Sequence, residues 1–248
     1  MVVGHHQAEG AGQVYYLYYY LYVILDVFSR FVVGWMVAER ESSELAKVLI
    51  ETSHERQGIA PGQLTIHSDR GPSMKSKTVA ELMVDLGVEK THSRPHVSND
   101  NPYSEAQFKT MKYRPDYPRR FGSSVDARGW AGPFFRWYNF EHYHSGLGLM
   151  TPAVVHYGQA ESVRARRQTV LEAAYADHPE RFVRGLPYPR CRLRCGSTNL
   201  NRSKKRRCCC WVVVMWSTWV CVRALVRLST SPQPPSGRAT RLGFDTNF

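Results

Sequence analysis

The feature of this sequence that most constrains its fold is the regular alternation of strand-like and helix-like segments between residues 15 and 112. Dense aromatic and aliphatic runs at 15–25 and 31–38 have the composition of two β-strands joined by a short turn. Helical and strand patterns then alternate, at 42–58, 64–66, 79–87, 88–93 and 102–112. This alternation predicts an α/β fold built on a mixed sheet.

Two carboxylates stand at the ends of elements in this pattern. Asp69 follows the predicted strand at 64–66, and Glu105 lies in the first turns of a helix that Asn101 caps and Pro102 begins. Two carboxylates brought together repel each other unless a cation lies between them, and an all-oxygen site suits Mg²⁺ or Mn²⁺. The pair therefore predicts a divalent-metal site that activates water or a hydroxyl against a phosphodiester.

The helix that carries Glu105 also carries two lysines. The spacing i, i+4, i+7 puts Glu105, Lys109 and Lys112 near one face. A carboxylate followed by lysines can hold metal at one end and DNA phosphates beyond it. The alternative is a solvated helix face with a Glu-Lys pair at i, i+4, and for this helix taken by itself it is the simpler interpretation.

Beyond Pro118 the chain becomes helical and aromatic. Pro133 interrupts this stretch, and because an interior proline costs a helix about 3 kcal/mol, a break is expected near it. A short helix is predicted to begin at Thr151-Pro152, and a longer, arginine-rich one covers 161–175.

The net charge of +12 is concentrated at one end, where eleven Lys and Arg face the single acid Asp245 from residue 191 onward. Overall charge is therefore weak support for DNA binding by the core. All six cysteines share that tail, and their absence from residues 1–190 fits a reduced compartment. A zinc site at Cys191 and Cys195 is conceivable, but the triplet at 208–210 lacks the spaced pairs of a zinc ribbon.

No membrane span is expected. The apolar run at 208–222 is shorter than the roughly 18 to 20 residues that a spanning helix needs, and no signal segment is visible near the first residue.

Several short motifs occur together and in one order: Asp26-Val-Phe-Ser-Arg with Val33-Gly-Trp, Asp69-Arg-Gly, Ser93-Arg-Pro to Asn99-Asp-Asn-Pro, Glu105 with Phe108-Lys109, Trp137-Tyr-Asn, His144-Ser-Gly-Leu and Thr151-Pro. With these motifs, residues 15–189 resemble the integrase core of bacterial insertion-sequence transposases, a DDE group similar to retroviral integrases. The resemblance implies an RNase H-like fold, a mixed sheet flanked by helices. It also implies DNA cleavage and strand transfer with two Mg²⁺ or Mn²⁺ ions.

In that family three carboxylates hold the metals, and Asp69 and Glu105 match the second and third. The first stands on the first strand in a pattern like W-D-I-T, where this chain has Gly-His-His-Gln-Ala-Glu at 4–9. Asp26 is a possible substitute, but its setting resembles the family's hairpin turn, and a turn role is the preferred interpretation. Glu9 lies in predicted coil. Whether either residue replaces the missing aspartate is left open by the sequence.

The genetic code suggests why the first aspartate is absent. One choice of codons for residues 3–9 reads W-D-I-T-K-L in another frame, and one for 190–199 reads S-L-P-T-A-V-W-I-N, which resembles the family's continuation. We hypothesise that both ends are frameshifted. The tail after Pro189 was then never selected to fold, and its deletion is expected to leave DNA binding unchanged. The alternative is a tail whose basic run at 204–207 contacts nucleic acid.

These observations divide the chain into four parts: an N-terminal coil at 1–14, an RNase H-like catalytic core at 15–122, a helical C-terminal extension at 123–189, and a basic, cysteine-rich, disordered tail at 190–248. The partners implied by the resemblance are DNA, further transposase subunits in a homo-oligomer, and a separate helix-turn-helix protein or segment that reads the element's ends. The bacterial cytoplasm is the expected location.

Three functions follow as hypotheses. The first is a transposase core fragment for DNA integration, inactive because one catalytic aspartate is missing. The second is a non-catalytic DNA-binding or assembly module that inhibits an active transposase. The third is a metal-dependent nuclease using Asp26, Asp69 and Glu105. Histidines at 67, 92, 96, 142 and 144 invite a zinc interpretation, but Pro95 disfavours a regular helical pair at 92 and 96. Roles in orienting a metal-binding residue or in contacting phosphate are therefore preferred.

Overall fold

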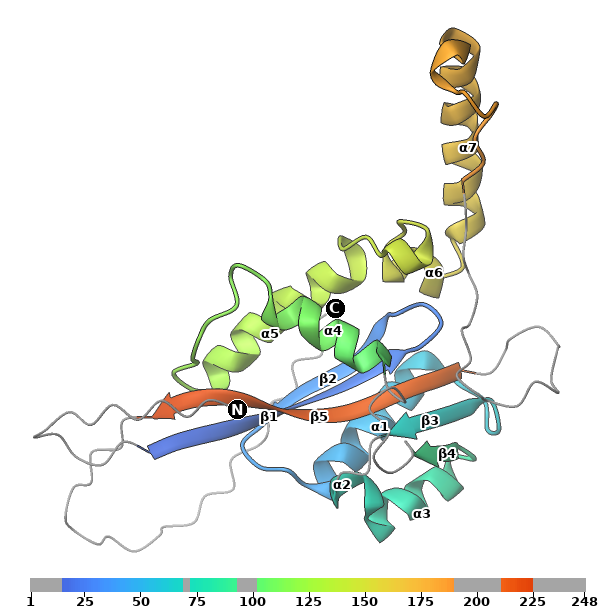
Figure 1. The fold of residues 1–248 in the computed structure, drawn as a ribbon. Helices are drawn as coiled ribbons and strands as arrows, with labels where there is room; N and C mark the ends of the chain where they lie inside the picture. The colour runs from blue at the N-terminus through green and yellow to red at the C-terminus, as the bar shows by residue number, and fades with distance from the viewer. Residues whose placement is uncertain (1–14, 69–71, 93–101, 190–210, 225–248) are drawn as a thin grey trace, which may run out of the picture.

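The computed structural model describes residues 15–68, 72–92, 102–189 and 211–224 (Figure 1). The strands are β1 (Tyr15–Asp26), β2 (Val32–Ala38), β3 (Leu64–Ser68), β4 (Glu89–His92) and β5 (Trp211–Ala224). The helices are α1 (Ser43–Gln57), α2 (Pro72–Lys75), α3 (Lys77–Asp85), α4 (Pro102–Lys112), α5 (Ser124–Phe140), α6 (Pro152–His156) and α7 (Ala160–Asp177), with short 3-10 turns η2 (Ser145–Leu147) and η3 (Pro179–Arg181).

The strands form one mixed sheet in the order β2-β1-β5-β3-β4. β1 pairs antiparallel with β2 and with β5, whereas β3 pairs parallel with β4 and with β5. The predicted α/β class and the predicted strands before residue 100 are therefore confirmed.

Helices cover both faces of the sheet, with α4 and α5 on one side and α1, α2 and α3 on the other (Figure 1). Each side has its own buried cluster, and alternate residues of β1 contribute to opposite clusters because side chains alternate along a strand. Leu21, Val23 and Leu25 pack with α4 and α5, whereas Tyr22 and Ile24 pack with α1 and α3. The pleat of β1 thus divides the core into two layers.

Short polar residues set the helix starts that position these layers. Ser42 caps α1 by accepting a hydrogen bond from the Glu44 amide, and Ser123 caps α5 by accepting one from the Asp126 amide. Gly58 ends α1 at φ +58°, a left-handed conformation that glycine adopts without steric cost.

The break expected near Pro133 does not occur, because α5 runs from Ser124 to Phe140 through that proline. Phe134, Phe135 and Tyr138 are buried in the cluster against β1. Burying a large apolar side chain contributes about 1.5 to 3 kcal/mol each, which is enough to offset the cost of one interior proline.

The expectation of a wholly disordered tail is also wrong, since residues 211–224 form β5 in the middle of the sheet. Valine and tryptophan make up eight of these 14 residues, and central strands covered on both faces are rich in such residues. The segments 190–210 and 225–248 lie outside the described residues.

The region predicted as a helical extension is divided between the core and a protruding helix. α5 belongs to the same buried cluster as β1, whereas α7 projects from the body of the molecule (Figure 1) and buries only Ala160. None of the described helices combines the length and the apolar character that crossing a membrane requires.

Candidate functional site

Of the two predicted catalytic carboxylates, the structure describes Glu105 but not Asp69. Glu105 lies in the first turn of α4, as expected, and its side chain is exposed. Asp69 directly follows Ser68, the last residue of β3, and is outside the described residues. The described part of the chain contains no group of three histidine, cysteine or acidic side chains that could hold a metal ion.

The helix α4 has a buried side and an exposed side. Ser104, Gln107 and Met111 are buried, while Glu105 and the predicted DNA-binding residues Lys109 and Lys112 are exposed. This distribution is consistent with the predicted common face. Lys112 places its ammonium nitrogen 4.4 Å from the centre of the Phe108 ring, a cation-π contact within the helix.

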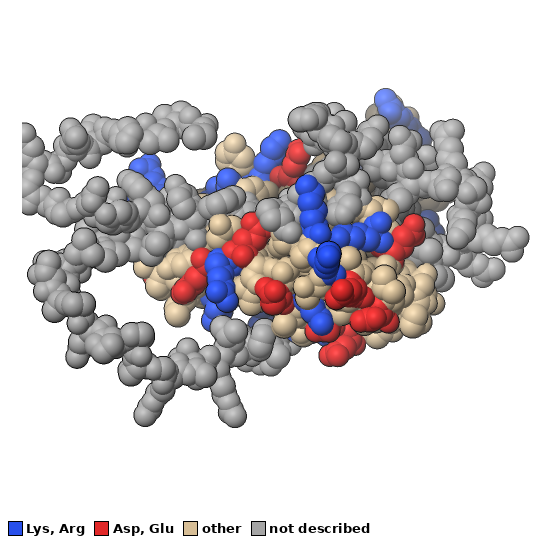
Figure 2. Space-filling model, turned by 90° about the horizontal axis from the view of Figure 1, so that it is seen from below, with Lys and Arg blue, Asp and Glu red and all other residues tan. Residues whose placement is uncertain are grey.

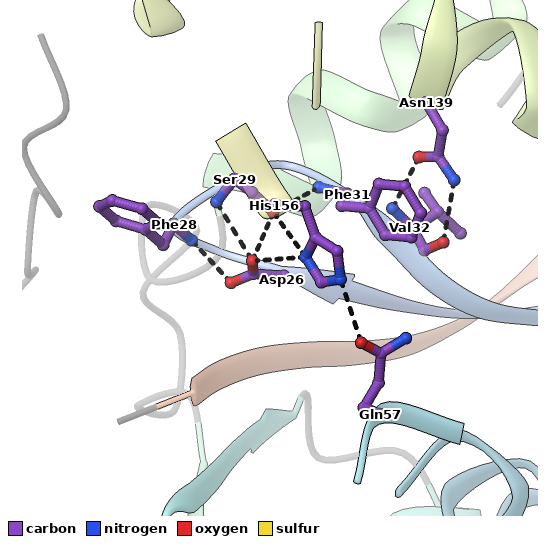
Figure 3. A network of polar contacts seen from close by, with 8 residues as sticks. All are labelled: Asp26, Phe28, Ser29, Phe31, Val32, Gln57, Asn139 and His156. Atoms are coloured by element: carbon purple, nitrogen blue, oxygen red, sulfur yellow. Dashed lines mark hydrogen bonds and ion pairs between the residues drawn. The ribbon is translucent and has the colours of Figure 1, made fainter. Parts of the chain in front are cut away.

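Asp26, the possible replacement for the missing carboxylate, is a turn residue. It is only 4% exposed, and its two carboxylate oxygens accept hydrogen bonds from the amides of Phe28 (3.0 Å) and Ser29 (3.3 Å) and from the Ser29 hydroxyl. The preferred interpretation from the sequence is therefore confirmed, because these contacts hold the hairpin between β1 and β2 (Figure 3).

The side chain of Asp26 also lies on the wrong side of the sheet to join Glu105. Side chains alternate along a strand, so Asp26 lies on the same face of β1 as Tyr22 and Ile24. Tyr22 and Ile24 pack with α1 and α3, whereas α4 packs on the opposite face. The nuclease hypothesis that combined Asp26 with Asp69 and Glu105 is not supported by this geometry.

A histidine that the sequence reasoning missed completes the network around Asp26. His156 of α6 places Nδ1 3.4 Å from Asp26 Oδ2 and 3.3 Å from Ser29 Oγ, and its Nε2 lies 3.0 Å from Oε1 of Gln57 at the end of α1 (Figure 3). The ring also stacks on Phe31, with centroids 4.2 Å apart. The motif Asp26-Val-Phe-Ser29 could have indicated the turn, but no sequence signal links it to residue 156.

Serine, histidine and aspartate together suggest a hydrolytic triad, but this arrangement does not work as one. Ser29 has no exposed surface, so no substrate can reach its hydroxyl. The network instead joins the β1-β2 turn, α1 and α6, and its role is structural.

A second histidine cluster lies where α5 ends. The rings of His142 and His144 are 4.5 Å apart and contact Tyr138, with Trp137 also against His142. Burial lowers the pKa of His144 to about 4, with His142 and Arg30 adding to the effect, and burial also lowers the pKa of His142. Both imidazoles are therefore neutral near pH 7.

One positive side chain approaches α4 from the β1-β2 turn. The guanidinium of Arg30, at φ +64° in the β1-β2 turn, lies 3.6 Å from the centre of the Tyr103 ring on α4. This contact brings a cation to the helix end that carries Glu105. On the opposite side of the sheet, seen from below in Figure 2, Lys and Arg are intermixed with Asp and Glu over the described surface.

Two family models and one curated relative match this chain. Two family models described as integrase core domain match residues 3–98 and 86–152. The transposase for insertion sequence element IS904 of Lactococcus lactis subsp. lactis (strain IL1403) is 28% identical over 134 residues, which are 54% of this chain and 53% of that protein. The chain thus spans about half the length of this relative.

Similar solved structures include two viral proteins. A chain of the simian T-cell lymphotropic virus intasome in complex with PP2A regulatory subunit B56 gamma has a TM-score of 0.44 and 18% identity, over 59% of this chain and 52% of that one. The catalytic core domain of BIV integrase has a TM-score of 0.43 and 20% identity, over 57% of this chain and 88% of that one.

Proposed function

This chain belongs to the integrase core domain family, whose models together match residues 3–152, and we propose that the protein is the catalytic-core portion of an insertion-sequence transposase and acts on DNA. The chemistry that the sequence motifs imply for a complete core of this family is phosphodiester cleavage followed by transfer of the freed 3′-hydroxyl to target DNA.

The observation that carries this proposal is that alternate residues of β3 lie on the side of the sheet that α4 covers. His67 of β3 pairs with position 214 of β5, which pairs with Leu25 of β1, and Leu25 packs in the cluster under α4. Paired residues of neighbouring strands point to the same face, so odd positions of β3 face α4. Glu105 is on α4, and we propose that Asp69, which follows β3 directly in the sequence and lies outside the described residues, joins it on that side.

Asp69 and Glu105 are the residues that would hold Mg²⁺ or Mn²⁺. When bound, such an ion stabilises the attacking and leaving oxygens at phosphorus. The residues themselves supply carboxylate oxygens, which is the donor set that these ions prefer. Glu105 fits this role because its exposed side chain, in the first turn of α4, is open to solvent and to a ligand.

DNA phosphates would lie along the exposed side of α4. Lys109 and Lys112 are exposed there, and Arg30 contacts the start of the same helix. Each lysine that neutralises a phosphate contributes to affinity in a salt-dependent way. Lys109→Ala should weaken binding to any sequence and flatten the salt dependence by about one counterion, whereas the matched change Lys75→Ala, on α2 across the sheet, should not. Equal effects of the two changes would argue against this face.

The protein is proposed to be inactive in strand transfer, because Asp26 serves the hairpin turn and leaves the site one carboxylate short. The test is strand transfer on a labelled, pre-cleaved element end with Mg²⁺ or Mn²⁺, beside a version in which W-D-I-T replaces residues 4–7. Activity only in the restored version supports the proposal. Activity in the unrestored chain that Asp69→Ala removes would show that another carboxylate completes the site.

A second candidate function follows from the same deficit. An integrase core that binds DNA and other subunits without cleaving would inhibit an active transposase by joining its oligomer. Mixing the chain with an active relative separates the two: a fall in transposition with rising amounts of this chain supports inhibition, and an unchanged rate excludes it.

The proposed frameshifts are tested by sequencing the gene in both alternative frames.

A further inference from the structure

The tail strand β5 occupies an unusual place for the last described segment of a chain. It lies between β1 and β3, and those two strands are not paired with each other (Figure 1). Its register runs from Tyr15 opposite Ala224 to Asp26 opposite Val213 on one side, and from Leu64 opposite Trp211 to Ser68 opposite Met215 on the other. Its removal would divide the sheet into two separate parts.

The backbone of β1 depends on β5 along its whole length. β2 pairs with β1 only from Tyr20 to Leu25, so the first five residues of β1, 15–19, pair with β5 alone within the described sheet. β3 likewise pairs with β4 on one edge and with β5 on the other. Buried amide and carbonyl groups without partners are costly, so both strands require an occupant between them.

The buried side chains of β1 and β3 also require a strand between these two strands. Leu64 and Ile66 of β3 are in one buried cluster with Tyr22 and Ile24 of β1. Neighbouring strands are about 4.8 Å apart, so β1 and β3 are about twice that distance from each other when one strand lies between them. The cluster is therefore continuous across the position of β5, and α1 and α3 pack over it.

We propose that the sheet contains a strand-acceptor site between β1 and β3, and that residues 211–224 of the same chain are its ligand. The site takes an extended segment rich in valine and aromatic residues, running antiparallel to β1 and parallel to β3. Main-chain hydrogen bonds on both edges supply the binding, as in other cases of strand addition. The tail is then required for the fold, which is the opposite of what the sequence suggested.

Proline substitutions in the full-length chain test whether β5 is required for the fold. Val213 pairs with Asp26 on one side and with Ile66 on the other, and proline there removes a donor from the middle of a sheet. Val213→Pro should abolish the cooperative thermal transition, while Ala239→Pro, outside the described strand, should leave it unchanged. A Val213→Pro protein that melts like the parent chain would overturn the proposal.

A disulfide cross-link tests whether β5 pairs with β1 and in which register. Cys221 lies opposite Tyr18 on β1, and directly opposed residues of an antiparallel pair have Cα atoms about 4.5 to 5.5 Å apart, within the range of a disulfide. In a chain whose other five cysteines are changed to serine, Tyr18→Cys should therefore form a disulfide with Cys221. Leu17→Cys is the matched control, because residue 17 lies opposite Val222 and not opposite Cys221.

The expected result is a disulfide within one chain for Tyr18→Cys, identified by peptide mapping without reduction, and little or none for Leu17→Cys. Equal cross-linking of the two variants, or none in either, would overturn the register and the proposal with it. A disulfide between two chains would overturn the assignment to the same chain. None of these outcomes depends on whether the protein binds or cleaves DNA.

Discussion

Asp26 and His156, from the end of β1 and the end of α6, meet with Oδ2 and Nδ1 3.4 Å apart in a site from which water is almost completely excluded. The contact ties the hairpin turn of the sheet to the helices that follow α5. It also explains why this aspartate, although it lies within the region matched by the integrase core domain model, has a structural role.

Asp26→Ala should destabilise the protein by about 2 to 4 kcal/mol, because it leaves two amides of the turn without their acceptor and removes the carboxylate that contacts buried His156. Urea denaturation measures the loss, and Glu81→Ala on an exposed helix position should change stability by less than about 0.5 kcal/mol. Any DNA cleavage should fall only in proportion to the folded fraction. Full stability with cleavage abolished would instead indicate a catalytic aspartate.

Gln107→Leu should stabilise the protein. Gln107 is 2% exposed on the buried side of α4, and within the described part of the chain neither its amide nitrogen nor its amide oxygen has a hydrogen-bond partner. Replacing such a group by an apolar one of similar size should add about 1 to 2 kcal/mol. Thermal melting checks this, with Gln63→Leu at an exposed position as the control. A lower melting temperature for Gln107→Leu would show that the amide makes a contact in the folded protein.

His144 should make stability depend on pH between about 4 and 6.5. Its folded pKa is about 4 because it is buried beside His142 and Arg30, whereas an unfolded histidine has a pKa of about 6.5. The unfolded chain then binds the extra proton in this window, so stability falls as pH falls. His144→Phe should reduce that slope, by about 1 to 2 kcal/mol over the window, in urea denaturation across pH. An unchanged slope, or an NMR titration of His144 near 6.5, would contradict the prediction.

Trp216→Asp should raise the affinity for Mn²⁺ if Asp69 and Glu105 hold a metal ion as proposed. Position 216 of β5 pairs with Val23, whose side chain packs on the side of α4, whereas position 215 pairs with Ile24 on the other side. Titration calorimetry with Mn²⁺ should show at least a tenfold gain in affinity for Trp216→Asp that a further Asp69→Ala removes. Met215→Asp is the control. Comparable Mn²⁺ binding by both variants would show that the gain does not come from the face of Glu105.

The sequence predicted the elements whose patterns are local. The strands and helices before residue 112 follow from the alternation of patterns and from caps such as Ser42 and Gly58. It also indicated the turn role of Asp26, because an aspartate can satisfy the amides of its own turn.

What the sequence could not predict depends on contacts between distant residues. Helix α5 continues through Pro133 because its aromatic side chains are buried against β1, and nothing near residue 133 shows that. His156 contacts Asp26 only once α6 has packed on the sheet. The strand at 211–224 was mistaken for unstructured tail because its only local signal was an apolar run, and its partners lie in the first seventy residues.

The pairing of Tyr15 with Ala224 closes a loop around nearly the whole described chain. The entropy of closing such a loop grows only slowly with its length, but sheets built from contacts so distant in sequence fold slowly. During synthesis the first strand would leave the ribosome long before its central neighbour exists. In the interval the open edges of β1 and β3 can pair with other chains, so the yield of folded protein should depend on chaperones and on the rate of translation.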